Sequence, residues 1–410
     1  MSETGWRHAN DLLDDLFPLR ESAAATALRG EFRAWLKANL TGRFTPLIGR
    51  GGAWDEENFS LNVEWERHLA AEGWACITWP KEFGGRSAGA AELFAYRDEY
   101  FRAGAPERVN FLAEDLVGPT LMKHGTPEQI DRFLPPMQRA EEMWCQGYSE
   151  PDAGSDLANI RTRARLQGDT WVIDGQKTWT SLAARSDWCF ALVRTEQGSA
   201  RRAGLSYLLI PMDQPGIEVR PIRQMTGSAE FAEVFFDGAV TSAENVVGAV
   251  GEGWSVAMAT LGFERDWFMS RYFRFARDLA VTVDYVRNTL GDPRAFEERI
   301  VRSFTELAAF RAIGLQTLAA HEAGESTSPL TSLTKLFGSS WHRDLGELSF
   351  SVLGAAGAQT HDQNTVEHAL QRTFLYSRAE PIFAGTNEIQ RNIIARRMLE
   401  LPSSTAGSRS

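Results

Sequence analysis

The stretch TWVIDGQKTWTS, from Thr170 to Ser181, alternates aromatic and β-branched residues with polar ones and has Asp174-Gly175 near its centre. This pattern is typical of β-strands, and an Asp-Gly pair between two such runs predicts a two-residue hairpin turn. Four further β-rich runs follow, at residues 187–195, 205–212, 216–222 and 232–240. We therefore expect a β-domain of about 100 residues, which is within the usual size range.

Helical patterns flank this β-domain on its N-terminal side, from about residue 24 to residue 139. Thr126 and Gln129 have the spacing of a capping box, and Pro127 suits the first helical turn, so a helix is expected to begin there. Pro135 and Pro136 are expected to kink or end that helix.

The C-terminal side of the β-domain is helical as well. From Trp254 to Val286, apolar residues recur every three to four positions, which is the period of a buried helix face, and residues 291–293 (GDP) should end this helix. The chain thus reads as a multidomain α+β protein. We expect a helical N-terminal domain (1–142), a β-barrel-like middle domain (143–247), a C-terminal helical bundle (248–401) and a disordered tail (402–410).

The composition is that of a globular protein with two or three domains, because 410 residues with 43% hydrophobic content can bury a large core. A net charge of -11 without a basic run argues against nucleic acid and anionic membranes as partners. The three cysteines are far apart and lack a CxxC spacing, which predicts reduced, packed thiols in the cytoplasm. No apolar stretch approaches the roughly 20 residues of a membrane span.

Common cofactor motifs are missing from the sequence. Neither a G-x-x-x-x-G-K-[ST] loop nor a strand-linked G-x-G-x-x-G is present, and the histidines show no metal-ligand spacing. Metal and nicotinamide chemistry are therefore not expected. What remains is the turn-rich loop QGYSEPDAGSDL (146–157), whose hydroxyls and backbone N–H groups suit either a polar ring edge or a simple tight turn.

Four motifs, taken together, resemble those of the acyl-CoA dehydrogenases, flavoenzymes that desaturate acyl thioesters. The loop 149–156 (SEPDAGSD) is similar to their TEPGAGSD element, and WTS (179–181) is similar to their WIT/WTS element. The segments QMTGSAEFAEVFFD (224–237) and FAGTNEIQRNIIARRML (383–399) extend the resemblance over nearly the whole chain. It implies the fold of that family, FAD as cofactor and an acyl-CoA as substrate.

The resemblance also implies roles for individual residues. Trp179 would pack against the flavin ring, although any one of 13 tryptophans could equally belong to the core. Ser181 would hydrogen-bond flavin N5, the atom that receives hydride. The implied cofactor contacts are Tyr148, Ser149, Gly154, Trp179, Ser181, Thr386 and Glu388, and the implied substrate contacts are Ser155, Arg265, Ala384 and Gly385.

The general base needs separate consideration. The commonest family pattern has a catalytic glutamate directly before Gly-Thr, where this chain has Ala384. Glu264 interrupts the apolar stripe, where a carboxylate is costly unless it is paired, for example with Arg265. However, GFER (262–265) resembles the helix on which isovaleryl-CoA dehydrogenases place their base, and these enzymes also have Ala or Gly before Gly-Thr. The resemblance thus favours Glu264 as the base.

Two departures from the family pattern bear on assembly. The family's Arg-x-x-Phe-Gly element, which binds the cofactor pyrophosphate across a subunit interface, is lacking where this chain has YVRNTLGDP (285–293). Its Leu-Gly-Gly-x-Gly element is altered to LGAAG (353–357). We expect either a homo-oligomer or a heterotetramer with a paralogous subunit, and an electron-transfer flavoprotein as electron acceptor.

The expected activity is FAD-dependent α,β-dehydrogenation of an acyl-CoA to the trans-2-enoyl-CoA, in the breakdown of fatty acids or sterols. Glu264 would take the α-proton while hydride passes to flavin N5. We expect the acyl chain to be branched or bulky. Two alternatives stay open: a non-catalytic partner subunit, and an oxidase or desulfinase acting on acyl thioesters.

Overall fold

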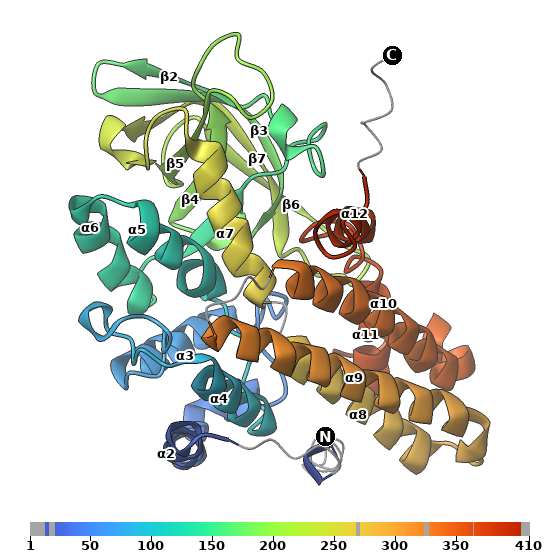
Figure 1. Ribbon diagram of the computed structural model, residues 1–410. Helices are drawn as coiled ribbons and strands as arrows, with labels where there is room; N and C mark the ends of the chain where they lie inside the picture. The colour runs from blue at the N-terminus through green and yellow to red at the C-terminus, as the bar shows by residue number, and fades with distance from the viewer. Residues whose placement is uncertain (1–12, 16–20, 268–270, 324–327, 364, 403–410) are drawn as a thin grey trace. The chain divides into compact units, whose positions relative to one another are not determined.

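The computed structural model describes residues 13–15, 21–267, 271–323, 328–363 and 365–402 (Figure 1). The tail expected to be disordered falls almost wholly outside these ranges. Contacts divide the chain into two compact units that are not contiguous in sequence. Unit 1 comprises Met1–Leu36, Gly89–Ala103 and Arg265–Ser410, and unit 2 comprises Lys37–Ala88 and Gly104–Glu264.

Unit 2 contains an eight-stranded sheet with the order β6-β7-β3-β2-β4-β5-β8, and β1 pairs in parallel with β4. All five predicted β-rich runs form strands, while the short β1, β2 and β8 were not predicted. Alternate residues of β3 and β7 and nearly all of β4 and β5 are buried, and these build the apolar core of the sheet. The strands are β1 (Trp144–Gly147), β2 (Arg163–Gln167), β3 (Thr170–Ser181), β4 (Trp188–Arg194), β5 (Leu205–Pro211), β6 (Ile217–Ile222), β7 (Phe231–Ser242) and β8 (Val246–Val247).

The hairpin predicted at Asp174-Gly175 is wrong. Both residues lie inside the continuous strand β3, at a register shift against β7. The turn lies instead at Gly168-Asp169, where β2 and β3 are joined by two residues and Gly168 has a φ of 60°. Gly175 serves a close approach, since a Cβ there would lie 2.7 Å from the Cα of Thr162.

The helices of unit 2 include α3 (Phe59–Ala71), α5 (Gly118–His124), α6 (Pro127–Gln138) and most of α7 (Gly253–Trp267). In Figure 1, α7 runs alongside the sheet. The capping box of Thr126 and Gln129 is confirmed. Helix α6 continues through Pro135 and Pro136 and ends two residues later. Each proline lacks the N–H that would bond to the carbonyl four residues earlier, so the helix loses two of its bonds just before it ends.

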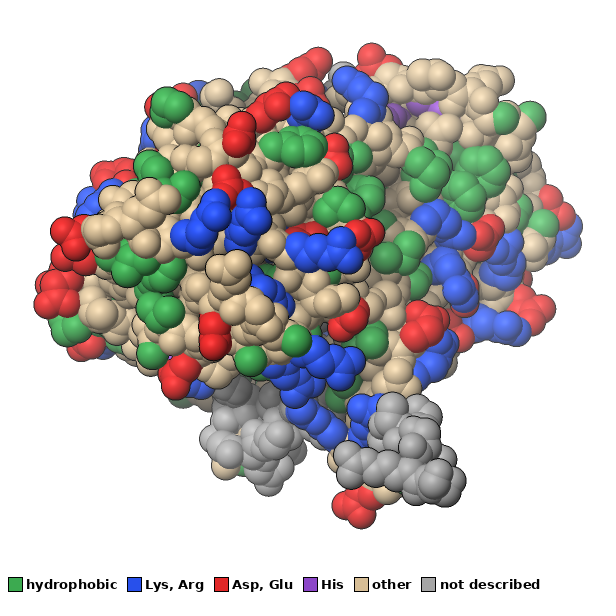
Figure 2. All heavy atoms as spheres, turned by 90° about the horizontal axis from the view of Figure 1, so that it is seen from above, with side chains coloured by type: hydrophobic (Ala, Val, Ile, Leu, Met, Phe, Trp, Pro, Cys, Tyr) green, Lys and Arg blue, Asp and Glu red, His purple; other side chains and the backbone are tan. Residues whose placement is uncertain are grey.

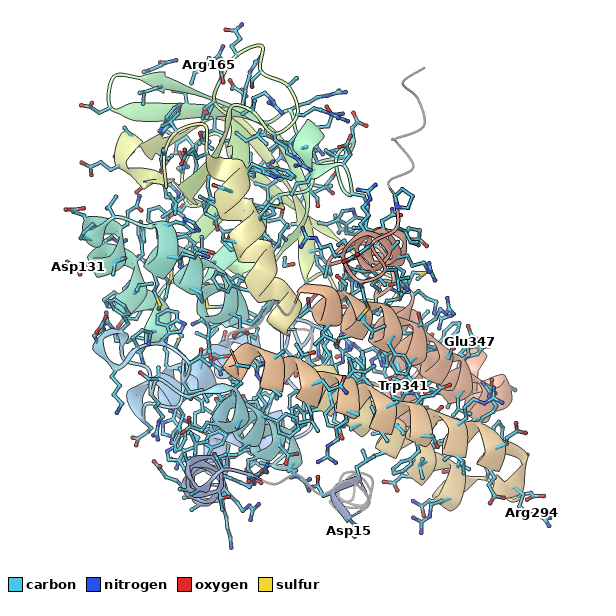
Figure 3. All side chains as sticks on the ribbon, viewed as in Figure 1. Asp15, Asp131, Arg165, Arg294, Trp341 and Glu347 are labelled. Atoms are coloured by element: carbon cyan, nitrogen blue, oxygen red, sulfur yellow. The ribbon has the colours of Figure 1, made fainter. Side chains whose placement is uncertain are left out.

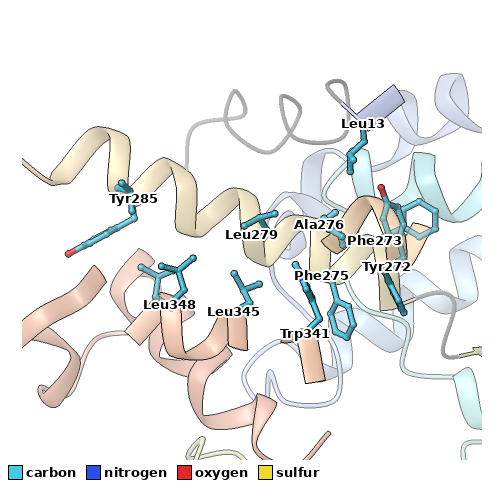
Figure 4. Close-up of a cluster of buried hydrophobic side chains, with 14 of the residues drawn as sticks. Leu13, Tyr272, Phe273, Phe275, Ala276, Leu279, Tyr285, Trp341, Leu345 and Leu348 are labelled. Atoms are coloured by element: carbon cyan, nitrogen blue, oxygen red, sulfur yellow. The ribbon is translucent and has the colours of Figure 1, made fainter. Parts of the chain in front are cut away.

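Unit 1 is helical. The predicted buried stripe is confirmed at Tyr272, Phe275, Leu279 and Val286, and the expected helix end is confirmed after Thr289. Its earlier part falls on α7, where Trp254, Met258 and Leu261 are half-buried, and Phe268 lies outside the described residues. Figure 4 shows how the aromatic and aliphatic side chains of α8 meet those of α10. The helices of this unit are α2 (Ala23–Asn39, whose last residues belong to unit 2), α4 (Ala90–Arg102), α8 (Arg271–Thr289), α9 (Glu297–Glu322), α10 (Ser328–Leu353), α11 (Val366–Ser377) and α12 (Asn387–Arg397).

Other sequence-based expectations concern cysteines and the surface. Cys76, Cys145 and Cys189 are free and buried, as predicted. Among the described helices, none combines the length and the hydropathy that crossing a membrane requires. On the face drawn in Figure 2, basic side chains are interspersed with acidic and apolar ones.

Candidate active site

The loop that follows β1 closes on itself. Glu150 and Ala153 exchange two backbone hydrogen bonds of 3.0 Å each, so residues 150–153 form a tight turn. Gly154 and Ser155 follow on the exposed side of this turn, and Ser149 before it is half-buried. The turn therefore presents the backbone and small side chains predicted to contact a ligand.

A buried ion pair fixes this turn to the sheet. Lys177 of β3 is fully buried, and its Nζ donates to Glu150 Oε1 (2.8 Å), to the Tyr148 carbonyl (3.1 Å) and to the Leu192 carbonyl (2.7 Å). Burial acts to raise the pKa of Glu150, but the contact with Lys177 outweighs it and the net pKa is lowered. Removing either charge would leave the other buried and unpaired.

Sequence reasoning missed this pair, although a signal was present. Lys177 has the inward register of Trp171 and Ile173 on β3, where an apolar residue would be expected. A lysine at such a position needs an internal partner.

Trp179 is not a core residue. Its side chain is 58% exposed, and its φ of 58° lies in the left-handed region that tryptophan rarely adopts. The register of β3 against β7 shifts between Lys177 and Thr180, and this bulge turns Trp179 out of the sheet. An exposed indole on a strained backbone is the kind of feature that is retained at ligand sites.

Two unpaired polar atoms, one on β3 and one on β1, would suit a polar ring system. Oγ1 of Thr180, which is fully buried, and Nε2 of Gln146 on the adjacent β1 have no hydrogen-bond partner in the described part of the chain. Each unpaired group costs about 1–3 kcal/mol when buried. The edge of a flavin carries both donors and acceptors, so these groups and the half-buried Ser181 are compatible with FAD.

Tyr148 contributes differently from its neighbours. Its ring packs edge-to-face against Phe190 and Tyr207 in the core. Any contact with a cofactor would therefore come from its backbone.

In unit 1, residues 384–388 include four of the predicted contact residues. They form the turn before α12 and the first residues of that helix. Ala384 and Gly385 have φ angles of 52° and 78°, so two successive residues are left-handed. Thr386 caps α12 by accepting from the Ile389 N–H (3.2 Å), and Glu388 is exposed and pairs with Arg391. Gln390 donates to the carbonyls of Ala384 and Gly385.

A charged network that is fully buried at Glu380 and His342 begins just before this turn, and it too was missed. Glu380 accepts from Arg271 Nη1 (3.0 Å) through one oxygen and contacts His342 Nδ1 (2.6 Å) through the other. His342 Nε2 contacts Asp278 of α8 at 3.1 Å. Burial alone would raise the pKa of Glu380, but His342 and Arg271 lower it. With both oxygens engaged and no exposed surface, Glu380 cannot accept a substrate proton.

The predicted base lies near the end of α7, but its side chain and that of Arg265 lie outside the described residues. The helix itself is anchored where it begins. A Cβ at Gly253 would come within 2.3 Å of the Ser206 backbone, and the Gly251 N–H donates to Ser206 Oγ (2.9 Å). Position 264 thus lies three turns beyond a contact with β5.

A basic hollow of about 390 Å³ also lies in unit 2. Arg194 orders its rim by donating to carbonyls on both sides, at Ala158 (3.2 Å) and Arg201 (3.1 Å). Figure 3 shows Arg165 projecting away from the sheet. The arginines that line the hollow are Arg161, Arg163, Arg165, Arg194 and Arg201.

The three parts of the chain match family models in order. The N-terminal, middle and C-terminal domains of acyl-CoA dehydrogenases match residues 24–141, 145–239 and 251–399. The chain therefore belongs to the acyl-CoA dehydrogenase family and is an oxidoreductase. The resemblance drawn from its motifs and the predicted fold are confirmed.

Several individual relatives are similar over almost the whole chain. Acyl-CoA dehydrogenase IpdE1 of Mycobacterium tuberculosis is 50% identical over 385 residues, covering 92% of this chain and 98% of the relative. IpdE1 of Mycolicibacterium smegmatis is 48% identical over 392 residues, with the same coverage. The solved Tcur3481-Tcur3483 steroid ACAD matches with a TM-score of 0.83 and 30% identity, covering 94% and 99% of the two chains. The ChsE4-ChsE5 complex from Mycobacterium tuberculosis matches with a TM-score of 0.80 and 28% identity, covering 95% and 100%.

One sequence interpretation needs revision. Arg287, Leu290 and Gly291 have the spacing of the Arg-x-x-Phe-Gly element, with leucine in place of phenylalanine. Arg287 is exposed at the end of α8. The arginine of this element is therefore retained, and only its aromatic residue is lost.

Proposed function

We propose that this chain is an FAD-dependent dehydrogenase that converts an acyl-CoA into its trans-2-enoyl-CoA. The observation that carries this proposal is the exposed, left-handed Trp179, which is followed directly by the buried hydroxyl of Thr180. This hydroxyl and the amide Nε2 of Gln146 on β1 have no hydrogen-bond partner among the described residues. Bound FAD would supply hydride acceptance. Trp179 would cover one ring face and exclude water, and Ser149 and Ser181 would hydrogen-bond its polar edge.

Glu264 is proposed as the general base that removes the α-proton. Two observations support this assignment. The position before Gly385-Thr386, where the family's commonest form has its glutamate, is the alanine Ala384. Glu380, four residues before Ala384, is held between Arg271 and His342, which lower its pKa, whereas a general base works best with a pKa near the working pH.

We propose that the thioester is carried on CoA rather than on a carrier protein. The basic hollow adjoins the loop after Ser155, and its arginines suit phosphate groups. The acyl-pantetheine thioester, which lacks the nucleotide, should then have a markedly higher KM than the matching acyl-CoA. An equal KM for both would contradict this assignment.

The acyl group is proposed to be bulky and derived from a ring system. Support comes from the steroid ACAD among the similar structures and from the cyclohexane-1-carbonyl-CoA dehydrogenase of Geobacter metallireducens, which is 27% identical over 350 residues. An electron-transfer flavoprotein is proposed to accept the electrons, in the cytoplasm.

The test is a spectral titration of purified protein under anaerobic conditions. The panel is butyryl-, octanoyl-, isovaleryl- and cyclohexanecarbonyl-CoA and the CoA ester of a steroid side-chain acid. Loss of flavin absorbance, fastest with a ring-bearing member, is expected. Protein that takes up no FAD, with or without a paralogous subunit, would favour the non-catalytic alternative. Hydrogen peroxide or sulfite release would indicate an oxidase or a desulfinase.

A further inference from the structure

Four buried hydroxyl groups from four different segments meet inside unit 2. They belong to Thr120 of α5, Tyr148 directly after β1, Tyr207 of β5 and Thr260 of α7. Thr120, Tyr207 and Thr260 are fully buried, and Tyr148 is 5% exposed. We call these four residues the hydroxyl cluster.

The bonds of the hydroxyl cluster join α5 to α7. Thr120 Oγ1 and Thr260 Oγ1 are 2.8 Å apart. Each also lies within hydrogen-bond distance of the carbonyl four residues earlier, that of Leu116 (2.7 Å) for Thr120 and that of Val256 (3.1 Å) for Thr260. Each threonine hydroxyl has one proton. It can donate this proton to the carbonyl four residues earlier or to the other threonine, but not to both at once.

The two tyrosines extend the cluster toward the sheet. Within the described part of the chain, the Tyr207 hydroxyl has no close hydrogen-bond partner, but it lies within reach of the hydroxyls of Thr260, Tyr148 and Thr120. Burial raises the pKa of Tyr207 strongly, and these three hydroxyls act against that rise. The ring of Tyr148 packs edge-to-face on that of Tyr207.

Stability alone does not account for these polar groups. Replacing both partners of a buried hydrogen bond by apolar groups of the same shape is often neutral for stability. Polar networks in a core instead favour one arrangement of the elements that carry them. The hydroxyl cluster is therefore suited to fixing a position rather than to adding stability.

The position that it fixes is significant for the chemistry. Thr260 precedes Glu264 by four residues, which is one helical turn on the same face of α7. Tyr148 directly precedes Ser149 and the loop proposed to hold the flavin edge. The cluster thus connects the helix of the base with the loop of the cofactor inside one compact unit.

We propose that Thr260 and Tyr207 are positioning residues for the dehydrogenation, which hold α7, and with it Glu264, in register with the loop 148–155. This inference rests on the proposed function for its catalytic meaning. Its structural part, the coupling of α7 to the loop, stands independently. A displacement of a catalytic group by about 1 Å can lower a rate about 100-fold, so the loss of one hydroxyl is expected to have a clear kinetic effect.

The test compares isosteric variants in the FAD-loaded protein. Thr260→Val and Tyr207→Phe should lower kcat about 10-fold with the fastest member of the acyl-CoA panel, change KM less than about 2-fold, and Thr260→Ser should restore most of kcat. Thr282→Val is the matched control, because Thr282 and Ser349 form a similar buried hydroxyl pair (2.9 Å) in unit 1. This control should keep the wild-type kcat.

Hydrogen–deuterium exchange separates this inference from the proposed function. In Thr260→Val and Tyr207→Phe, both the end of α7 and the loop 148–155 should exchange faster, whereas Thr282→Val should leave both segments unchanged. This readout applies even if no thioester reduces the flavin. Unchanged exchange in both segments would overturn the positioning role. So would a change in KM alone while kcat stays at the wild-type value.

Discussion

The backbone conformation of Trp179 costs free energy, and residues with such a cost are concentrated at functional sites. The residue has a left-handed φ, and because its side chain is exposed it contributes little packing to the protein without ligand. Trp179→Ala should therefore change stability by less than about 1 kcal/mol while weakening FAD binding about 10-fold, since stacked aromatic contacts contribute about 1 kcal/mol beyond area burial. Flavin fluorescence titration and thermal unfolding measure the two effects.

A buried tryptophan provides the matched control. Trp144 is 1% exposed and packs on Phe133 and Trp188, so Trp144→Ala should cost about 3–5 kcal/mol. A large loss of stability in Trp179→Ala, with unchanged FAD affinity, would show that Trp179 is a packing residue.

Glu264 is tested at the same scale. Glu264→Gln should leave FAD and acyl-CoA binding nearly intact but lower the rate of flavin reduction at least about 100-fold, the scale expected for removal of a general base. Stopped-flow absorbance measures this rate. Glu252→Gln, an exposed carboxylate just before α7, is the control. Near-normal reduction by Glu264→Gln would mean that another residue is the base.

At the scale of elements, strand β3 depends on one buried charge. Lys177→Met would leave Glu150 buried without its cation, which should destabilise β3 and the turn 150–153 by about 3–5 kcal/mol. Native-state hydrogen exchange measures this change. The double variant with Glu150→Gln should recover part of the loss because no unpaired charge remains, and a double variant as unstable as Lys177→Met would argue against this explanation.

The network around Glu380 predicts a pH dependence for unit 1. Burial acts to lower the pKa of His342, but Glu380 and Asp278 outweigh it and the net pKa is raised. Two carboxylates contact His342, and each has arginine partners on α8: Asp278 pairs with Arg274 and Arg277, and Glu380 pairs with Arg271. His342 therefore adds stability that is complete below its unfolded pKa of about 6.5 and is lost as pH rises through its raised folded pKa.

The carboxylates of Glu380 and Asp278 determine how the stability of this network changes at acidic pH. The folded pKa values of Glu380 and Asp278 are lowered, so their contribution is present above about pH 4 and is lost as pH falls through the folded values. Thermal unfolding followed from pH 5.5 to pH 7.5 should show a fall in the midpoint that is absent in His342→Gln. This window lies below the pKa of Lys335, which burial lowers to about 8. An equal fall in the variant would exclude His342 as its origin.

The strands and helices could be predicted because their signals are local. The alternation in β3, the continuous apolar runs of β4 and β5 and the capping box of α6 depend on neighbouring residues alone. The turn at Asp174-Gly175 failed because tertiary contacts override turn propensity: Asp174 accepts from Arg165 and from the Gly238 N–H, which keeps it in the strand. Sequence motifs located Trp179, but its bulge follows from the pairing with β7.

The ion pairs of the site could not be predicted from the sequence, for a different reason. Glu380 and His342 are 38 positions apart, and nothing in a single sequence pairs one glutamate among many with one histidine. At the scale of the whole molecule the same limit applies. Helices α2 and α4 have ordinary N-terminal patterns, yet they belong to the same unit as the C-terminal helices. Arg29 of α2 pairs with Asp98 of α4, and Phe94 of α4 contacts Phe273 of α8.

Assembly is the last property that the chain suggests at this scale. The segment LGAAG (353–357) replaces the family's Leu-Gly-Gly-x-Gly. We predict that the chain holds FAD well only with a paralogous subunit, because the two charges of the cofactor diphosphate need cations or N–H groups from an interface. Expressed alone, it should contain much less than one FAD per chain.

The presence of Arg287 allows a direct test of this prediction. If Arg287 serves a pyrophosphate across the interface of two identical chains, the protein expressed alone will be a homo-oligomer with one FAD per chain, and Arg287→Ala will lose it. Arg294→Ala is the control, since Arg294 is paired locally with Asp292 (2.9 Å). Mass in solution and flavin absorbance per chain decide the matter: a fully loaded homo-oligomer contradicts the need for a partner, and about one FAD per pair of unlike chains supports it.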